Sequence, residues 1–265
     1  MSHSDDPSPE SVNSLDRGLR LLQALRDFGT IRVTDAADQL GVSRSTAHRL
    51  LSTLVRRGFA IQDDGRLYRP GPALEAGPAR LEWAHELRLR CRPHLARLAE
   101  RSGDSANLMI RLGVHIRFLS TVRAESPDAT LDREGTVMLA HHASGGKALL
   151  AELDPDRVAM LFGGREAARL PAQDRPALSA LHRELAGVRS RGFATNEEQT
   201  ERNVLAVGVT IHDHTGDAIG AVSLSARLDR GSAPHTTEMA ALLSATRDDI
   251  ERDLASHPLR RRPER

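Results

Sequence analysis

The sequence has one cysteine, one lysine, few aromatic side chains and no long apolar run. A single cysteine, Cys91, excludes a disulfide framework and a cysteine-based zinc finger, and it favours a reducing compartment. No segment approaches the roughly 20 consecutive apolar residues of a membrane-spanning helix. The first ten residues are polar and hold no apolar core of a secretory signal. We therefore expect a cytoplasmic protein.

What is present is an ordinary globular composition in a chain long enough for two domains. Of 265 residues, 39% are hydrophobic and 28% are charged, which excludes wholesale disorder, collagen and coiled coil. The net charge is only +1, yet residues 12–70 hold 10 arginines against 6 acids. A basic cluster in a nearly neutral chain is the electrostatic footprint of a nucleic-acid contact, although a solvated basic face explains it equally well.

A pattern of three short helices follows the polar leader. Apolar residues spaced by three and four predict helices over 12–28 and 33–40. Gly41 provides a tight turn, and Ser43 is a candidate N-cap of the third helix. Two helices joined in this way, the second with polar and basic residues at its start, are typical of a helix-turn-helix, whose second helix fits the major groove of DNA.

Two short strands over 59–62 and 67–69 predict a hairpin, or wing, directly after these helices. Arg66 stands at its tip, a position suited to a minor-groove or phosphate contact. We predict that the DNA-binding residues are Ser43, Arg44, Ser45, Thr46, His48, Arg49 and Arg66. Ser43 serves equally well as a cap alone, and Arg56 and Arg57 equally well as solvated charges.

The remainder of the chain reads as an α+β domain after a linker rich in glycine and proline. Pro93 is expected to start a new helix rather than interrupt one. We expect antiparallel hairpins to form a sheet with the helices packed at one side of it. Strands are predicted over 106–111, 115–122, 137–140, 204–212 and 218–225, and helices over 147–153, 156–162, 175–190 and 236–255.

The segment Ser144-Gly145-Gly146-Lys147 permits three interpretations. As Ser-x-x-Lys it is the nucleophile motif of serine β-lactamases, but that class also needs a Lys-Thr-Gly and this chain has no second lysine. As a P-loop it lacks the earlier glycine, and Ala148 stands where a magnesium-binding hydroxyl belongs. As a helix start, its small residues leave backbone N–H groups free for a carboxylate. Helix packing alone also explains the glycines.

Two further pairs of polar residues are candidate sites. Ser223 and Ser225 are two apart on a predicted strand, so both face one side, where they suit a bound carboxylate or are satisfied core serines. His212 and His214 suggest a metal, but without a further ligand placed by spacing they are more typical of a polar turn. We expect no metal and no cofactor.

Blocks of sequence in a fixed order resemble the IclR family of bacterial transcription regulators. These blocks are Ser14–Leu22, Gly41–Leu51, Leu54–Phe59, Tyr68–Gly71, Arg92–Ala99, Ala143–Ala151, Val188–Ala194 and Asn196–Glu198. The resemblance covers roughly residues 12–231. It implies a winged helix-turn-helix, a linker helix and a GAF-like effector-binding domain. It also implies operator binding as a homodimer or dimer of dimers, altered by a small organic acid.

The resemblance organises the predictions into domains and a pocket. The domains are a disordered leader over 1–11, a winged helix-turn-helix over 12–71, a linker helix over 72–92, an effector-binding domain over 93–257 and a disordered tail over 258–265. The expected effector-binding residues are Ser144, Gly145, Gly146, Asn196, Glu197, Leu205, Ser223 and Ser225.

One segment departs from the family pattern. Residues 199–208 are one residue shorter than usual, with Arg202 near a usual glycine and Gly208 in place of a usual proline. Because this loop borders the expected pocket, no ligand identity is carried over from the family.

The resulting prediction is a sequence-specific regulator that is not an enzyme. Its partners would be double-stranded promoter DNA and a small organic acid effector. The alternatives are a small-molecule hydrolase or a protein-interaction module, each carrying a winged helix that does not bind DNA.

Overall fold

The computed structural model describes residues 10–63, 67–75, 82–125, 130, 132–168, 170–228 and 236–259. The chain forms two compact units, divided near residue 77. Among the described helices, none is both long and apolar enough to span a bilayer.

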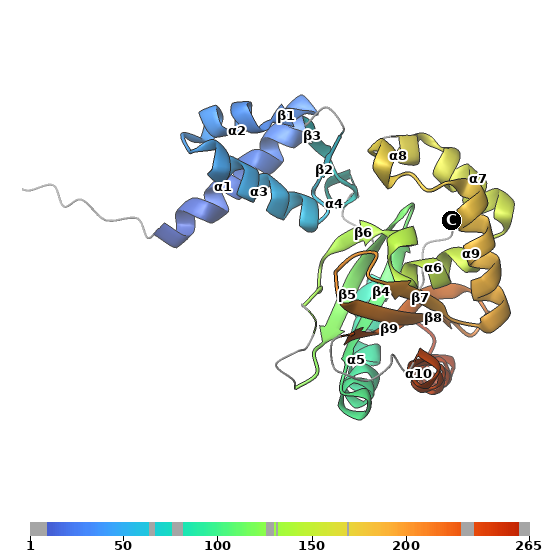
Figure 1. Ribbon diagram of the computed structural model, residues 1–265. Coiled ribbons are helices and arrows are strands. Elements are labelled where there is room, and N and C mark those ends of the chain that lie inside the picture. The colour runs from blue at the N-terminus through green and yellow to red at the C-terminus, as the bar shows by residue number, and fades with distance from the viewer. Residues whose placement is uncertain are drawn as a thin grey trace, which may run out of the picture. The chain divides into compact units, whose positions relative to one another are not determined.

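The N-terminal unit is three longer helices, one short helix and a small sheet (Figure 1). Its elements are α1 (Glu10–Phe28), β1 (Ile31–Arg32), α2 (Val33–Leu40), α3 (Arg44–Arg56), β2 (Ala60–Gln62), β3 (Leu67–Pro70) and α4 (Pro72–Glu75). The sheet order is β1-β3-β2, with antiparallel pairs. The three predicted helices and the wing hairpin are confirmed. The predicted leader is too long, because Glu10 and Ser11 already belong to α1.

The turn between α2 and α3 has the geometry that the sequence predicts. Gly41 has φ +62° and Val42 N–H donates to the carbonyl of Ala37 at 3.0 Å, which closes the end of α2. A left-handed residue there favours glycine, which has no Cβ to clash. The core beneath is formed by the apolar stripe of each helix and by residues of the wing. It includes Leu21, Leu25, Ala36, Ala47, Leu51, Ala60 and Tyr68.

The C-terminal unit is a six-stranded antiparallel sheet of order β6-β5-β4-β9-β8-β7 with helices around it. Its strands are β4 (Ser105–Leu112), β5 (His115–Val122), β6 (Val137–Leu139), β7 (Ala194–Glu197), β8 (Val204–His212) and β9 (Ala218–Arg227). Its helices are α5 (Glu82–Ser102), η1 (Ala140–His142), α6 (Ser144–Ala151), α7 (Pro155–Gly163), α8 (Arg165–Ala168), η2 (Ala172–Asp174), α9 (Leu178–Arg191) and α10 (Thr236–Ser256).

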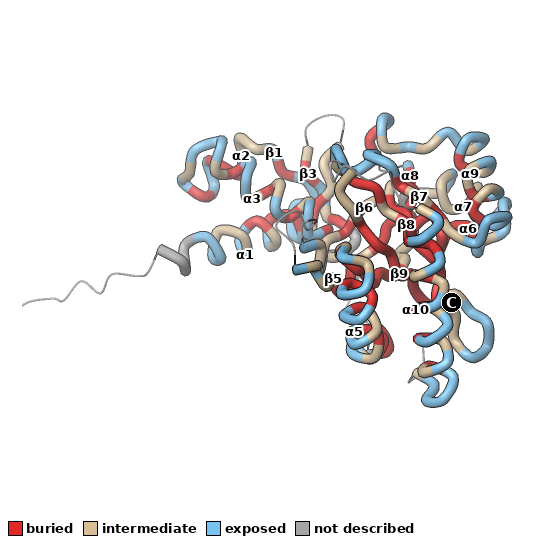
Figure 2. The backbone as a smooth tube through the Cα atoms, turned by 60° about the horizontal axis from the view of Figure 1, so that its bottom comes forward, coloured by how far each residue is buried: buried red, intermediate tan, exposed pale blue. Residues whose placement is uncertain are grey.

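Helices cover both faces of this sheet, which corrects the expectation of helices at one side (Figure 1). One cluster joins α5 and α10 to the sheet, and a second joins α6, α7 and α9 to the opposite face. The reason is that β8 and β9 are buried on both faces (Figure 2). In β9, Val222 and Leu224 belong to the α5 and α10 cluster, whereas Ala221 belongs to the other.

Helix α5 runs through Pro93 without ending, so the predicted new helix at Pro93 is wrong. A proline inside a helix removes one N–H and displaces the carbonyl four residues earlier, here that of Leu89. Both Pro93 and Leu89 are exposed, so water can reach that carbonyl. The buried stripe Leu87, Cys91 and Leu95 crosses the proline and holds both halves of the helix against the sheet. Burial raises the pKa of the Cys91 thiol to about 12.

Candidate functional site

Helix α3 begins with a hydroxyl cap. The Ser43 Oγ accepts a hydrogen bond from the backbone N–H of Thr46 at 3.2 Å, and it lies 2.9 Å from the hydroxyls of Ser45 and Thr46. The Ser43 hydroxyl therefore caps the start of α3, as the sequence predicts.

One side of α3 is polar and basic along its length. Arg44, Ser45, His48 and Arg49 are exposed and Thr46 is half-buried, while the opposite side is packed into the core of the unit. Within the part of the chain that the structure describes, no carboxylate is paired with Arg44, His48 or Arg49. Free guanidinium groups on an exposed helix face are available to phosphates or to guanine edges. Arg66, predicted at the wing tip, lies outside the described residues.

The wing carries an internal ion pair at its base. Asp63 accepts hydrogen bonds from the backbone N–H of Leu67 at 2.9 Å and from Nε of Arg69 at 3.0 Å. These contacts close the hairpin between β2 and β3. Arg69 is thus neutralised by Asp63, in contrast to the arginines at the start of α3.

A small cavity opens in the C-terminal unit, on the α6 side of the sheet. Its volume is about 20 Å³, room for roughly one water molecule. Its lining is Met109, Phe118, Arg133, Met138, Ala143, Ser144, Asn196, Thr200, Val204, Ala206, Ser223 and Ser225. Four of the predicted effector-binding residues therefore meet here from three elements, α6, β7 and β9: Ser144, Asn196, Ser223 and Ser225.

A chain of hydrogen bonds ends at the cavity. The backbone N–H of Arg133 donates to the Thr121 hydroxyl at 3.2 Å. That hydroxyl donates to Asn107 Oδ1 at 2.9 Å, and Asn107 Nδ2 donates to Ser225 Oγ at 3.3 Å. Because the Ser225 oxygen already accepts from Asn107, its own O–H remains to donate. The chain thereby orients Ser225 as a donor toward the cavity.

Arg133 is the one cationic side chain of this lining, and the sequence reasoning missed it. Its side chain is 16% exposed, and Nη2 contacts Oε2 of Glu201 at 2.8 Å. The guanidinium also lies over the Phe118 ring, 5.9 Å from its centroid. Burial lowers the pKa of Arg133, and the Glu201 carboxylate opposes that shift. A cation, a serine donor and apolar walls make this cavity chemically suited to a small organic anion.

The other four predicted pocket residues do not line this cavity. Leu205 faces the α5 and α10 cluster, because successive residues of β8 point to opposite faces. Glu197 is exposed at the end of β7. A side chain at Gly145 would meet the Met109 sulfur at 2.6 Å, and one at Gly146 would meet the carbonyl of Ala140. Close packing therefore accounts for both glycines.

The loop between β7 and β8 borders the cavity and is tied down at several points. Asn196 Nδ2 donates to the His142 carbonyl and to Thr200 Oγ1, and Asn196 Oδ1 accepts from the backbone N–H of Gln199 at 3.1 Å. Glu198 and Asn203 at the two ends of the loop have φ +54° and +59°, left-handed values that are uncommon outside glycine.

Both parts of the chain match known proteins. Residues 14–64 match the IclR helix-turn-helix domain, and residues 83–252 match the C-terminal domain of the bacterial transcriptional regulator IclR. The chain belongs to the IclR family. Regulators of this family combine a DNA-binding helix-turn-helix with a C-terminal domain that binds small-molecule effectors.

Individual relatives agree with the family assignment over most of the chain. The regulator BhcR of Paracoccus denitrificans is 32% identical over 89% of this chain and 86% of the relative. The repressor IclR of Escherichia coli is 28% identical over 89% and 88%. The solved IclR of Thermotoga maritima has a TM-score of 0.59 at 23% identity, covering 92% of this chain and 99% of that one. BhcR and the Escherichia coli IclR are transcriptional regulators, which confirms the prediction of a regulator rather than an enzyme.

A further solved relative carries a ligand. An IclR homolog of Microbacterium hydrocarbonoxydans, complexed with 4-hydroxybenzoate, has a TM-score of 0.58 at 23% identity and covers 91% of this chain and 98% of that one. At this identity the likeness shows a shared fold.

Lys147 is structural in this member of the IclR family. It is 1% exposed, and its Nζ donates to Glu184 Oε1 at 2.5 Å, Gln199 Oε1 at 2.6 Å and the Thr195 carbonyl at 3.1 Å. All three of its N–H donors are used by these acceptors. Lys147 is therefore held away from a role in activating Ser144, which argues against the Ser-x-x-Lys nucleophile interpretation.

His212 is an ionic link rather than part of a polar turn. Its Nε2 lies 3.3 Å from Glu152 at the end of α6, and its Nδ1 lies 3.0 Å from Glu251 of α10. The hydrogen bond to Glu152, with that to Glu251, raises the pKa of His212 to about 9 against the opposing effect of burial. The protonated imidazole therefore joins helices on opposite faces of the sheet.

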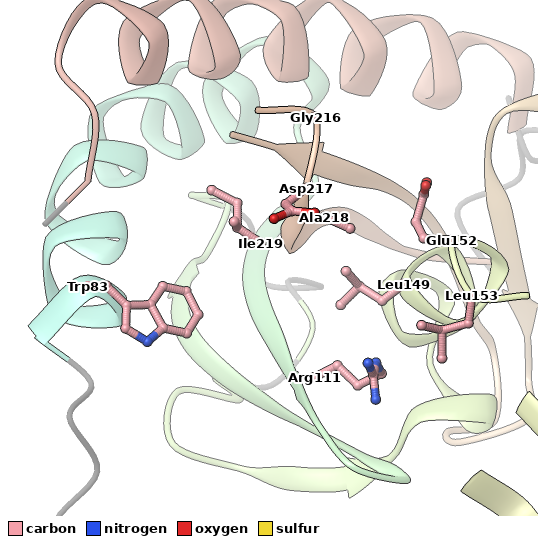
Figure 3. Close-up of a pocket in the computed structure, with 9 residues that line it drawn as sticks. All are labelled: Trp83, Arg111, Leu149, Glu152, Leu153, Gly216, Asp217, Ala218 and Ile219. Atoms are coloured by element: carbon pink, nitrogen blue, oxygen red, sulfur yellow. The ribbon is translucent and has the colours of Figure 1, made fainter. Parts of the chain in front are cut away.

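A larger hollow of about 180 Å³ lies at the start of β9 (Figure 3). Figure 3 shows Arg111 with Leu149 and Leu153 at one side and Asp217 at another. Glu152 also lines it, so two carboxylates contribute to its surface. Two carboxylates against the single guanidinium of Arg111 give this lining a net negative charge, which disfavours an anionic ligand. The smaller cavity beside Arg133 therefore fits an organic acid better, despite its size.

Proposed function

We propose that this IclR-family protein is a transcription regulator whose affinity for promoter DNA changes when a small organic acid binds the cavity beside Arg133. The observation that supports it is the buried guanidinium of Arg133 together with the Ser225 donor in an otherwise largely apolar lining. A carboxylate needs positive or donor groups, and its carbon body needs apolar walls.

The ligand class is supported by one relative and limited by the volume of the cavity. The Microbacterium hydrocarbonoxydans homolog of the same fold is complexed with an aromatic acid, 4-hydroxybenzoate. A cavity of about 20 Å³ must widen before it accepts even a small acid. Met109 and Met138 line it, and unbranched methionine side chains repack at low cost.

For DNA binding, we propose the exposed face of α3 with the wing. Ser43, Arg44, Ser45, Thr46, His48, Arg49 and Arg66 form the proposed contact set. The proposed functional modules are the winged helix-turn-helix over 12–71 and the effector-binding domain over 93–257. A homodimer or dimer of dimers would place two such helices on successive half-sites of a palindromic operator. Light scattering of the purified chain measures that state directly.

The two sites would communicate through a population shift. A ligand changes DNA affinity only to the extent that it binds two conformations of the protein with different affinity. By the same linkage, operator DNA must change the affinity for the acid by the same factor.

The test is binding of the purified protein to a labelled fragment of its own upstream intergenic DNA. Tight, sequence-dependent binding that falls steeply with added salt supports the DNA-binding role, because phosphate contacts release counterions. Acetate, benzoate and 4-hydroxybenzoate are then added at fixed salt, with sodium chloride as the ionic control. A change in DNA affinity with a carboxylate but not with chloride supports the effector role. The absence of DNA binding even at low salt would contradict the proposal.

A further inference from the structure

The ion pair between Arg133 and Glu201 stands out among the contacts of the cavity. Arg133 lines the cavity, and Glu201 lies on the loop between β7 and β8 that borders it. Both side chains are mostly buried, at 16% and 22% exposure, and their atoms are 2.8 Å apart. The group that would bind an organic acid is thus already bound to a carboxylate of the same chain.

We infer that Glu201 is an internal stand-in for the ligand: a small carboxylate binds by replacing Glu201 on the guanidinium of Arg133. This inference rests on the proposed function and specifies how the effector is recognised. The ligand class that follows is a monocarboxylate with a compact apolar body, since Arg133 offers one fork-shaped donor and most of the lining is apolar.

Exchange, rather than simple addition, follows from the burial of Arg133. A buried guanidinium that loses its carboxylate and gains nothing is strongly disfavoured, because its charge is then neither hydrated nor paired. An incoming carboxylate offers the same two oxygens that Glu201 offers. A neutral amide of the same shape lacks the charge and cannot take over the pair.

A second cation, Arg227, lies close enough to pair with Glu201 after Glu201 is displaced from Arg133. Nη2 of Arg227, at the end of β9, lies 3.9 Å from the other carboxylate oxygen of Glu201. The Arg227 side chain is 32% exposed, so this pair sits closer to solvent than the pair with Arg133. Displacement therefore moves Glu201 from a buried cation to a more hydrated one.

The loop that carries Glu201 holds backbone strain on both sides of that residue. Glu198 and Asn203, on either side of Glu201, both hold left-handed backbone angles, which cost free energy for residues other than glycine.

The loop also connects the cavity to the rest of the domain. Gln199 accepts a hydrogen bond from the buried Lys147, and Thr200 accepts one from Asn196. When Glu201 moves, either α6 and β7 move with it through these hydrogen bonds, or the backbone between Thr200 and Asn203 changes conformation. Either way, binding of the carboxylate changes the loop, which is the differential contact that an effector requires.

The experiment compares E201Q with a charge-matched control on the same loop. Glu198 is exposed and its Oε1 accepts from the backbone N–H of Asn203, an interaction that glutamine can retain. Isothermal titration measures acetate, benzoate and 4-hydroxybenzoate against acetamide and benzamide, on the full-length chain. E201Q is expected to bind the carboxylates at least tenfold more tightly than the wild type, and E198Q within twofold of it. The amides should be unaffected by either substitution.

R133Q supplies the reciprocal arm. It is expected to lose at least tenfold in carboxylate affinity and to show no preference for acids over amides, and adding E201Q to it should restore nothing. If R133Q does not fold, the difference in carboxylate affinity between E201Q and E198Q is sufficient to test the inference. Equal carboxylate affinity in wild type and E201Q would overturn the inference, as would a folded R133Q that binds acids like the wild type.

These outcomes are distinct from failure of the proposed function. Carboxylate binding that follows Glu201 and Arg133 but leaves DNA affinity unchanged supports the inference and contradicts the effector role. Carboxylates that shift DNA affinity equally in wild type, E201Q and R133Q overturn the inference alone. If no carboxylate binds either the wild type or E201Q, both are overturned.

Discussion

On α3 the guanidinium groups of Arg44 and Arg49 are exposed, with no acidic partner in the described part of the chain, whereas Lys147 and Arg133 of the C-terminal unit are buried against carboxylates. The same positive charge thus has two roles in one molecule. An exposed cation keeps its hydration and its counterions until a polyanion displaces them. A buried cation must have its partner built into the fold.

The difference teaches where each kind of charge can be changed. Loss of an exposed cation is expected to weaken intermolecular binding and to leave the fold intact. Loss of a buried cation is expected to act first on stability, because its partners are left without a donor. Glu201, the internal partner of Arg133, lies on a strained loop. By the inference above, a carboxylate ligand can replace it on the guanidinium.

The largest effect is expected for Lys147→Met. The substitution keeps an unbranched side chain but removes the ammonium group, which leaves Glu184, Gln199 and the Thr195 carbonyl without their shared donor. We expect the free energy of unfolding to fall by about 3 kcal/mol, measured by urea denaturation. The double variant with Glu184→Leu should recover part of the loss. A loss below about 1 kcal/mol would mean that this buried pair behaves like a surface one.

Arg49→Ala tests an exposed cation, and we expect it to change DNA binding rather than stability. Specific operator affinity should fall by about 1–3 kcal/mol, because an arginine on the exposed face of the recognition helix is the common reader of guanine. Urea denaturation should show an unchanged stability. Arg252→Ala on α10 is the matched control and should leave DNA affinity unaltered. Native operator affinity in a folded Arg49→Ala variant would remove Arg49 from the contact set.

His212→Gln tests a cation whose charge depends on pH. The folded-state pKa of about 9 is above the usual 6.5, so the stabilisation is complete below pH 6.5 and is lost as the pH rises through 9. Partial exposure limits it to about 1–2 kcal/mol. Denaturation of both proteins from pH 6 to 10 should show a difference that vanishes at the alkaline end. A difference independent of pH would mean that His212 acts by packing alone.

The smallest effect is expected for Arg252→Ala. Its pair with Asp249 spans one helical turn of α10, and both side chains are largely in solvent, at 72% and 50% exposure. Such pairs contribute at most about 0.5 kcal/mol, and added salt screens them. Thermal unfolding at low and high salt is the measurement. A larger loss would erase the contrast between exposed and buried cations.

How far the sequence could anticipate this molecule depends on how local the signal is. The Ser43 cap and the full length of β8 were predictable because a hydroxyl before a helix and an apolar run between turns are local patterns. Strand β7 has no such pattern. Its residues Ala-Thr-Asn-Glu pair with β8 at the edge of the sheet, and that partner supplies the ladder.

The candidate site shows the same limit. Two serines on alternate positions of β9 are visible in the sequence, and the structure places both at the cavity. Arg133 is one of 36 arginines, in a segment without periodicity. Its importance comes from Glu201, which is distant along the chain and meets it only after folding. The placement of Leu205 shows the converse, because a one-residue difference in strand phase sends a side chain to the opposite face.

The buried position of Cys91 has a practical consequence for spectroscopy. It is the only cysteine in the chain. It lies on α5 and is fully buried in the core against the sheet, and its pKa of about 12 leaves almost no reactive thiolate at neutral pH. A cysteine introduced on the surface, for example at Arg252, would therefore be labelled selectively by a thiol-reactive fluorophore or spin label. The natural background need not be removed first, so distance measurements between subunits or between protein and DNA could begin from the native sequence with a single substitution.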